Sequence, residues 1–121
     1  MRKKILIIDD EQDLVAVVKL RLEANNFLVS EAFTAKEGLK KAEGQSPDII
    51  LLDIQLPDGD GYQVCQKLKS NPQTQGIPII IFTASSLKDL AKKAMDNGAA
   101  DYVIKPFEPK DLLEKINKAI K

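Results

Sequence analysis

Short apolar segments alternate with segments of helical periodicity along this chain. Five runs rich in Ile, Leu, Val and aromatic residues, with little polar alternation, predict strands buried on both faces, which is typical of parallel sheets. In chain order these runs are Ile5–Ile8, the weaker Phe27–Val29, Ile49–Leu52, Ile77–Phe82 and Tyr102–Ile104. A segment of helical period follows each run, with apolar residues three and four positions apart. The pattern therefore predicts five strands, each followed by an amphipathic helix.

Local start and stop signals support these helices. A Ser or Thr followed three residues later by an acid can cap a helix start, and Pro is favoured in the first turn. The start signals are Thr34 with Glu37, Ser86 with Asp89, and Pro109. Glycine is favoured just beyond a helix end, where the backbone turns left-handed. We expect Gly44 and Gly98 to end the second and fourth helices.

Five strand–helix units in 121 residues indicate the α/β class and one domain over residues 1–121. We expect a five-stranded parallel sheet, doubly wound, with the flavodoxin-like strand order 2-1-3-4-5 and five helices. Ligands of such sheets bind beyond the carboxyl ends of the strands, where the winding reverses between strands 1 and 3. The last predicted helix reaches the end of the sequence, so we expect no output domain.

Composition narrows the classes of function. The chain has no histidine, which excludes His general bases, Ser-His-Asp and Cys-His catalysis, and His-containing metal sites. Its single cysteine, Cys65, cannot form an internal disulfide and fits a reducing compartment. The formal net charge is zero, which provides no strong field for nucleic acid or an anionic membrane. The apolar run after Lys4 is too short for a secretory signal. We therefore expect a cytoplasmic protein with no membrane contact.

Polar residues follow or end four of the predicted strands. Asp9 and Asp10 follow the first strand, Asp53 the third, Thr83 the fourth and Lys105 the fifth. Each has an ordinary alternative, since an acid after a strand often caps a helix and a threonine is a good strand former. In the 2-1-3-4-5 order, however, these strands are neighbours. We expect three carboxylates, a hydroxyl and an ammonium to converge on one crevice.

The charges of this cluster point to a metal ion and a phosphoryl group. Three carboxylates so close together cannot all stay ionised unaided, and one lysine offsets only part of their repulsion. Mg²⁺ suits the site because it prefers oxygen ligands. With the cation present, Lys105 and Thr83 could hold an anion, in a layout that suits phosphoryl transfer. Asp53 is then the plausible nucleophile, because carboxylates can form acyl phosphates.

Four motifs in this order resemble the receiver domain of response regulators in bacterial two-component systems. They are Asp9-Asp10, Asp53 followed by the segment 56–61 (Leu-Pro-Asp-Gly-Asp-Gly), Thr83-Ala84, and Lys105-Pro106-Phe107. Each motif is weak alone, but their order and spacing match the predicted elements. The resemblance extends over essentially the whole chain, from the first strand to the last helix.

The resemblance implies a role for each matching residue. Asp53 would accept a phosphoryl group from a phosphohistidine. Asp10 would bind Mg²⁺ directly and Asp9 through water, with Asp53 and the carbonyl of Gln55 completing the protein ligands. Lys105 would contact the phosphoryl group, and its bond to Pro106 would be cis.

The resemblance also implies a switch and its partners. Thr83 would move toward the phosphoryl oxygens and Tyr102 would turn inward behind it. This would change the face formed by the fourth helix, fifth strand and fifth helix. The donor would be a sensor histidine kinase or a histidine phosphotransfer protein, and a phosphorylation-dependent homodimer is an option. The chain would not be a turnover enzyme, because it would catalyse only its own phosphorylation and dephosphorylation.

Two other functions are compatible with the same fold. A Mg²⁺-dependent phosphohydrolase would share the chemistry of the site. A flavin- or nucleotide-binding module would need a Gly-rich or Ser/Thr-rich phosphate loop after the first strand. The acids Asp9, Asp10 and Glu11 occupy that place and would repel an unaccompanied phosphate. The first strand's loop therefore disfavours the binding module.

Overall fold

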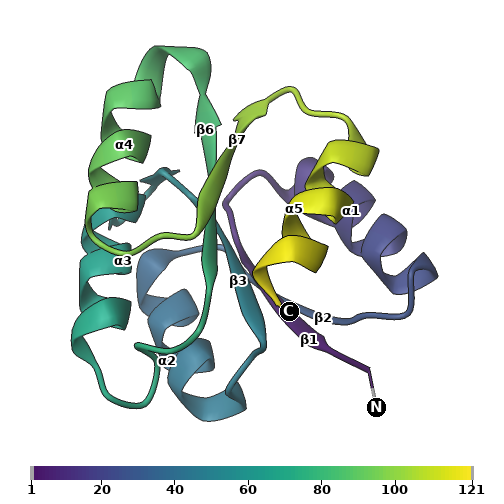
Figure 1. Cartoon of the computed structure of the whole chain (residues 1–121), viewed down its shortest axis with the longest axis horizontal. Helices are drawn as coiled ribbons and strands as arrows, with labels where there is room; N and C mark the ends of the chain where they lie inside the picture. Colours follow the sequence, from purple (N-terminus) through teal and green to yellow (C-terminus); the bar gives the residue numbers. More distant parts are fainter. Residues whose placement is uncertain (1, 121) are drawn as a thin grey trace.

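Five parallel strands form the central sheet of the computed structural model, which describes residues 2–120 apart from the side chains of Ser85 and Lys88. The strands are β1 (Lys4–Ile8), β2 (Leu28–Ala32), β3 (Ile49–Asp53), β6 (Ile79–Ala84) and β7 (Asp101–Lys105). Their order is β2-β1-β3-β6-β7, which is the predicted 2-1-3-4-5 order once the short strands β4 and β5 are set aside (Figure 1).

Helices cover both faces of the sheet, as expected of a doubly wound fold. They are α1 (Gln12–Ala24), α2 (Ala35–Gln45), α3 (Gly61–Ser70), α4 (Lys88–Asp96) and α5 (Pro109–Ala119). Ile5 and Ile7 of β1 pack with the apolar residues of α1 and α5. Leu6 and Ile8 alternate with them and pack on the side of α2, α3 and α4 (Figure 1). This alternation of buried residues gives the sheet one apolar core on each face.

Three of the predicted helix boundaries are confirmed. The Thr34 hydroxyl accepts a hydrogen bond from the backbone N–H of Glu37 at 3.1 Å, and the Glu37 carboxylate accepts from Phe33 N–H at 2.8 Å. Gly98 follows α4 with a φ of 105°, a conformation that glycine adopts at little cost. Pro109 is the first residue of α5, as expected.

Two other boundary predictions are wrong. Ser86 does not start the fourth helix: a 3₁₀ turn over Ser85–Leu87 comes first, and α4 begins at Lys88 without a side-chain cap. Gly44 does not end the second helix, which continues to Gln45, and Ser46 takes the left-handed conformation with a φ of 47°. Pro47 explains the position of this end, because a proline disfavours the right-handed helical conformation in the residue before it.

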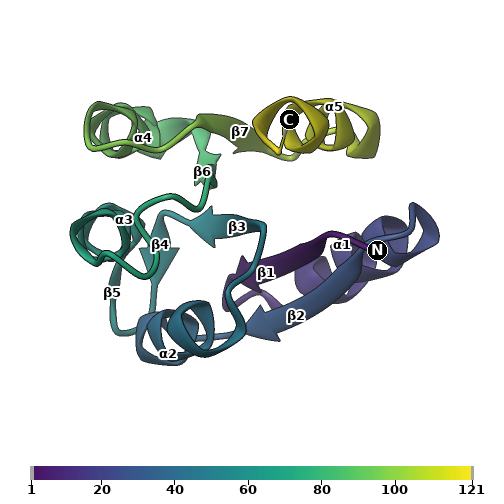
Figure 2. The same ribbon diagram turned by 60° about the horizontal axis from the view of Figure 1, so that its bottom comes forward.

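A small antiparallel hairpin lies between β3 and α3 and was not predicted. It pairs β4 (Gln55–Leu56) with β5 (Gly59–Asp60), next to α2 and α3 (Figure 2). Gly61, directly after β5, has no room for a side chain, since a Cβ there would clash with the carbonyl oxygen of Asp53. The hairpin is therefore held tightly against the end of β3. None of the helices within residues 2–120 has both the length and the apolarity needed to cross a membrane.

Candidate functional site

A crevice of about 360 Å³ lies at the carboxyl ends of the central strands. Its lining comes from the last residues of β3, β6 and β7 and from the segments that follow β1, β3 and β6: Asp10, Glu11, Asp53, Gln55, Leu56, Pro57, Ala84, Leu87 and Lys105. Because β1 and β3 are neighbours and their crossovers run in opposite directions, the crevice stands where the winding of the sheet reverses. This is the position that the sequence predicted for a ligand.

The acids after β1 do not serve as helix caps. Glu11, not Asp10, is the residue that precedes α1, and its side chain makes no capping hydrogen bond. Asp9 is fully buried, and its carboxylate accepts hydrogen bonds at 2.9 Å from both Glu11 N–H and Lys105 Nζ. Carboxylate oxygens of Asp9, Asp10 and Asp53 all lie within 4.8 Å of one another. Three oxygen donors so placed suit a hard divalent cation such as Mg²⁺.

Asp53 ends β3 and is 6% exposed. Its Oδ1 accepts a hydrogen bond from Gln55 N–H at 3.2 Å, and its Oδ2 lies 3.5 Å from Lys105 Nζ. Burial, followed by the charge of Asp9, raises the pKa of Asp53 to about 6. The fold therefore holds a carboxylate whose negative charge is unfavourable until a cation or further neutralisation arrives.

Lys105 is the cation of this crevice. Its Nζ lies 2.7 Å from Glu11 Oε1, 2.9 Å from Asp9 Oδ2 and 3.5 Å from Asp53 Oδ2. Burial alone would lower the pKa of Lys105, but the hydrogen bonds to Glu11 and Asp9 and the charge of Asp53 outweigh burial and raise it. The peptide bond between Lys105 and Pro106 is cis, as expected.

Thr83 and Tyr102 stand apart from this cluster. The Thr83 side chain is fully buried, and its hydroxyl donates to the carbonyl of Ala84 at 2.9 Å. Tyr102 is half-buried in the edge strand β7, with Lys115 Nζ 5.5 Å from its ring centre. Neither residue lines the crevice. The structure thus brings together the three aspartates, Gln55 and Lys105. The two predicted switch residues, Thr83 and Tyr102, are not part of this cluster.

Comparison with known proteins agrees with this geometry. The family model of the response regulator receiver domain matches residues 5–117. This chain belongs to that family. The receiver domain is 40% identical over 118 residues to the response regulator ArlR of Staphylococcus saprophyticus, covering 98% of the chain and 52% of the relative. It is 39% identical over 120 residues to the alkaline phosphatase synthesis transcriptional regulatory protein PhoP of Bacillus subtilis, covering 99% and 49%.

Solved structures show the same fold. A putative response regulator from Chloroflexus aurantiacus superposes with a TM-score of 0.94 at 29% identity, covering 99% of this chain and 98% of the other. A CheY-like receiver domain protein from Methanospirillum hungatei gives a TM-score of 0.92 at 34% identity, covering 99% and 94%. The predicted family and the flavodoxin-like fold are confirmed. The receiver domain spans about half the length of the curated relatives it matches.

Two contacts of the receiver site were missed by sequence reasoning. The first is the Glu11–Lys105 ion pair. Glutamate is not among the residues favoured at the position before a helix, and this was a signal that the Glu11 side chain has another partner. The second is Asp58, at the turn of the hairpin, whose carboxylate accepts from Ala35 N–H at 2.7 Å and Lys36 N–H at 3.0 Å. These bonds lower the pKa of Asp58 and tie the loop after Asp53 to the start of α2.

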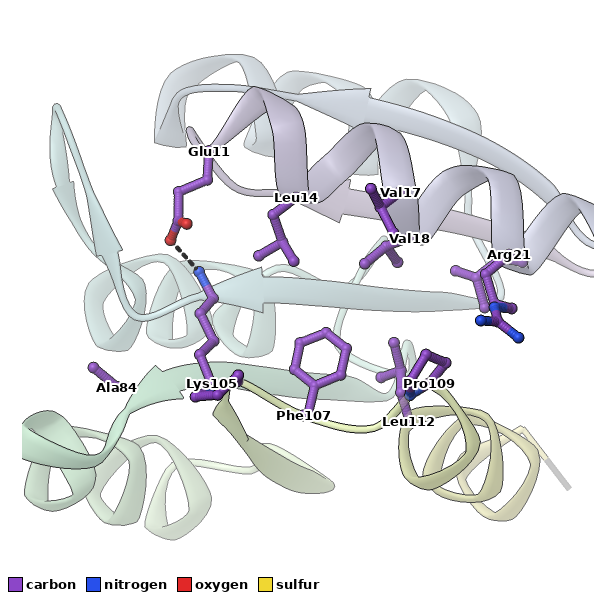
Figure 3. A pocket seen from close by; sticks show the side chains of 12 residues that line it. Glu11, Leu14, Val17, Val18, Arg21, Ala84, Lys105, Phe107, Pro109 and Leu112 are labelled. Carbon is purple, nitrogen blue, oxygen red and sulfur yellow. Dashed lines mark hydrogen bonds and ion pairs between the residues drawn. The ribbon is translucent and has the colours of Figure 1, made fainter.

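An apolar pocket of about 450 Å³ adjoins the receiver crevice on the other side of Lys105. It lies between α1 and the start of α5, and its walls include Leu14, Val18, Phe107 and Leu112 (Figure 3). The Glu11–Lys105 pair forms the boundary between this pocket and the acidic crevice, because both residues line both cavities. An apolar surface therefore begins directly beside the charged site.

Proposed function

We propose that this receiver domain is a phosphoacceptor switch in which Asp53 takes a phosphoryl group from a phosphohistidine. One observation carries the proposal: the Asp53 carboxylate lies 3.5 Å from the Lys105 ammonium and within 4.8 Å of two further carboxylates, at the ligand position of the fold. Such a group is a nucleophile whose new charge can be matched by a lysine and a divalent cation.

In the proposed transfer, an oxygen of Asp53 attacks the phosphorus atom. The bond between phosphorus and the donor's imidazole nitrogen breaks, and the electron pair stays with that nitrogen. The product is an acyl phosphate on Asp53. Attack of water on phosphorus later breaks the bond to the Asp53 oxygen, which releases inorganic phosphate and restores the carboxylate. The chain would thus catalyse only its own phosphorylation and dephosphorylation, and we propose that it is not a turnover enzyme.

Mg²⁺ is the proposed cofactor, and the donor chemistry of the crevice fits it. Asp9, Asp10, Asp53 and the carbonyl of Gln55 would hold the ion, since they supply only hard oxygen ligands. When bound, the ion would neutralise negative charge as the phosphoryl group approaches the three carboxylates. Lys105 would orient and neutralise the phosphoryl oxygens, since its Nζ lies 3.5 Å from Asp53 Oδ2.

The proposed output is a change of the surface formed by α4, β7 and α5. A phosphoryl group brings more charge and more hydrogen-bond acceptors than the carboxylate it modifies. It could attract the Thr83 hydroxyl, which now bonds only to the neighbouring Ala84 carbonyl among the described residues. Tyr102 would follow into the space that Thr83 leaves. A downstream partner, or a second copy of the chain, would recognise the changed surface.

A sensor histidine kinase or a histidine phosphotransfer protein is the proposed donor. The exposed Val17 and Leu20 of α1, beside the apolar pocket, support docking of a protein donor next to the crevice. The cytoplasmic location stays a prediction. So does the lack of nucleic-acid binding, which we predict for this domain and not for the longer proteins that carry such domains.

Intact mass after incubation with a small phosphodonor and Mg²⁺ tests the proposal. We expect the mass of one phosphoryl group to be added to the wild type, and none to the Asp53→Asn variant or to wild type in EDTA. A folded protein that stays unmodified and does not bind beryllofluoride would contradict the proposal. Turnover of a small phosphoester without an adduct on Asp53 would favour a Mg²⁺-dependent phosphohydrolase instead.

A further inference from the structure

The contact between Glu11 and Lys105 is the shortest ion pair of the crevice, at 2.7 Å. Glu11 stands at the position before α1 where a side chain usually caps the helix, but it makes no capping bond. Its carboxylate reaches across to the lysine instead, as Figure 3 shows. We propose that Glu11 restrains Lys105 and thereby opposes phosphorylation of Asp53. This inference rests on the proposed function of Asp53.

The number of N–H groups on Lys105 explains why its contact with Glu11 competes with a contact to the phosphoryl group on Asp53. An ammonium has three N–H groups: two of those on Lys105 donate to Asp9 and Glu11, and Asp53 Oδ2 lies farther away, at 3.5 Å. A phosphoryl group on Asp53 presents several acceptor oxygens, so to bind it with more than one N–H Lys105 has to release an existing partner. The phosphoryl group therefore cannot simply be added to the contacts already present.

Burial decides which partner leaves. The Asp9 side chain is fully buried and loses its cation only at a high cost, while Asp53 carries the phosphoryl group itself. The Glu11 side chain is 58% exposed and can turn into water. We conclude that Lys105 exchanges Glu11 for a phosphoryl oxygen when Asp53 is modified.

A contact that exists only in the unmodified state stabilises that state against the modified one. Exposed ion pairs contribute little, so the expected effect on the equilibrium is about two- to five-fold. Glu11, whose side chain lines both the crevice and the apolar pocket, would thus modestly reduce phosphorylation of Asp53.

Three variants separate contact from charge. Glu11→Gln removes the charge, and Glu11→Asp keeps the charge but is one methylene shorter, so it cannot keep the contact with Lys105. Asp13→Asn removes an exposed charge from the first turn of α1, two residues away. If the contact with Lys105 opposes phosphorylation, both Glu11 variants should differ from the wild type in their affinity for beryllofluoride, and Asp13→Asn should not.

The experiment is a titration of the full chain with beryllofluoride at saturating Mg²⁺, followed by the amide signals of the crevice in NMR spectra. We expect both Glu11 variants to bind beryllofluoride about two- to five-fold more tightly than the wild type, with Asp13→Asn unchanged. Thermal unfolding of each variant confirms that the fold is intact.

Other outcomes overturn the inference in distinct ways. Tighter binding by Glu11→Gln but not by Glu11→Asp would mean that net charge, not the contact, sets the affinity. Weaker binding by both would mean that Glu11 prepares Lys105 for the phosphoryl group. If the folded wild type binds no beryllofluoride at all, the proposed function of Asp53 fails, and this inference fails with it.

Discussion

Two regions at the carboxyl ends of the strands differ in how tightly they are held: the lysine side around Lys105, and the threonine side around Thr83, which does not line the crevice. On the lysine side, Lys105 is joined to Asp9 and Glu11 by hydrogen bonds between groups that are distant in sequence. On the threonine side, the hydroxyl of Thr83 bonds only to the carbonyl of the next residue, among the residues that the structure describes. Ionic contacts with distant residues hold Lys105, whereas the hydrogen bond that the Thr83 hydroxyl donates is local.

This difference separates two tasks that a phosphorylation switch has to perform. Placing charge around Asp53 requires groups that are already in position, which lowers the cost of reorganisation during the reaction. Signalling requires a group with two alternative partners of similar strength, so that a new acceptor can change its position. The lysine side suits the first task and the threonine side the second.

Removal of the ammonium should have the largest effect. We expect Lys105→Met to slow phosphorylation by a small phosphodonor by about 100-fold, because one stabilising donor at a charged transition state is lost. The variant should also be less stable to unfolding by roughly 3 kcal/mol, since the buried Asp9 loses its only ion-pair partner among the described residues. Intact mass over time and urea unfolding measure the two effects.

Lys110→Met is the matched control, because Lys110 is an exposed lysine in the first turn of α5. It should behave like the wild type in both measurements. Equal rates for Lys105→Met and Lys110→Met would mean that the lysine side contributes no more than general surface charge.

The second effect is a pH-dependent stability that depends on Asp53. The pKa of this carboxyl group is raised from 3.8 to about 6 on folding, first by burial and then by Asp9. The folded state therefore binds this proton more tightly than the unfolded chain, and stability falls as the pH rises from 3.8 to about 6. Asp53→Asn should lack this loss and be more stable than wild type at neutral pH by about 1–3 kcal/mol.

Urea unfolding in EDTA at pH values below, within and above this interval measures the difference between the two proteins. The advantage of Asp53→Asn should shrink toward acidic pH, where the wild-type carboxyl group is protonated. Asp13→Asn, at an exposed acid, provides the control. If the wild type and Asp53→Asn keep a constant difference at all pH values, burial does not perturb Asp53.

The smallest change in stability is expected on the threonine side. Thr83→Val keeps the shape of the side chain and removes one hydrogen bond, so its stability should fall by about 1 kcal/mol at most. Beryllofluoride should still bind, but the NMR signals of α4 and β7 should no longer shift when it does. Thr83→Ser restores the hydroxyl and should restore the response. If the NMR signals of α4 and β7 still shift fully in Thr83→Val when beryllofluoride binds, Thr83 has no role in the switch.

Much of the fold could be predicted because its signals are local. Buried strands such as Ile49–Leu52 appear as continuous apolar runs, and Gly98 marks a left-handed turn after a helix. The end of α2 was predicted one residue early, although Pro47 in the sequence favours an end at Ser46, and the start of α4 was missed because the turn over Ser85–Leu87 comes before it. The short hairpin β4–β5 has too few residues to produce a periodic pattern.

The sequence by itself determined the five strand–helix units, their parallel arrangement and the positions of Asp9, Asp10, Asp53 and Lys105 at the strand ends. Residue type and periodicity carry that information, because strands covered on both faces must be apolar and must end in polar loops. Motif order added the family, which the comparisons confirmed.

Only the tertiary structure decided which partners these groups have. Glu11 and Lys105 are 94 residues apart in sequence, and Asp58 lies 23 residues from the helix start that it caps. Whether Thr83 contacts the crevice or the Ala84 carbonyl depends on side-chain packing. Such contacts depend on distances of a few ångströms between separate elements, and no local pattern in the sequence encodes them.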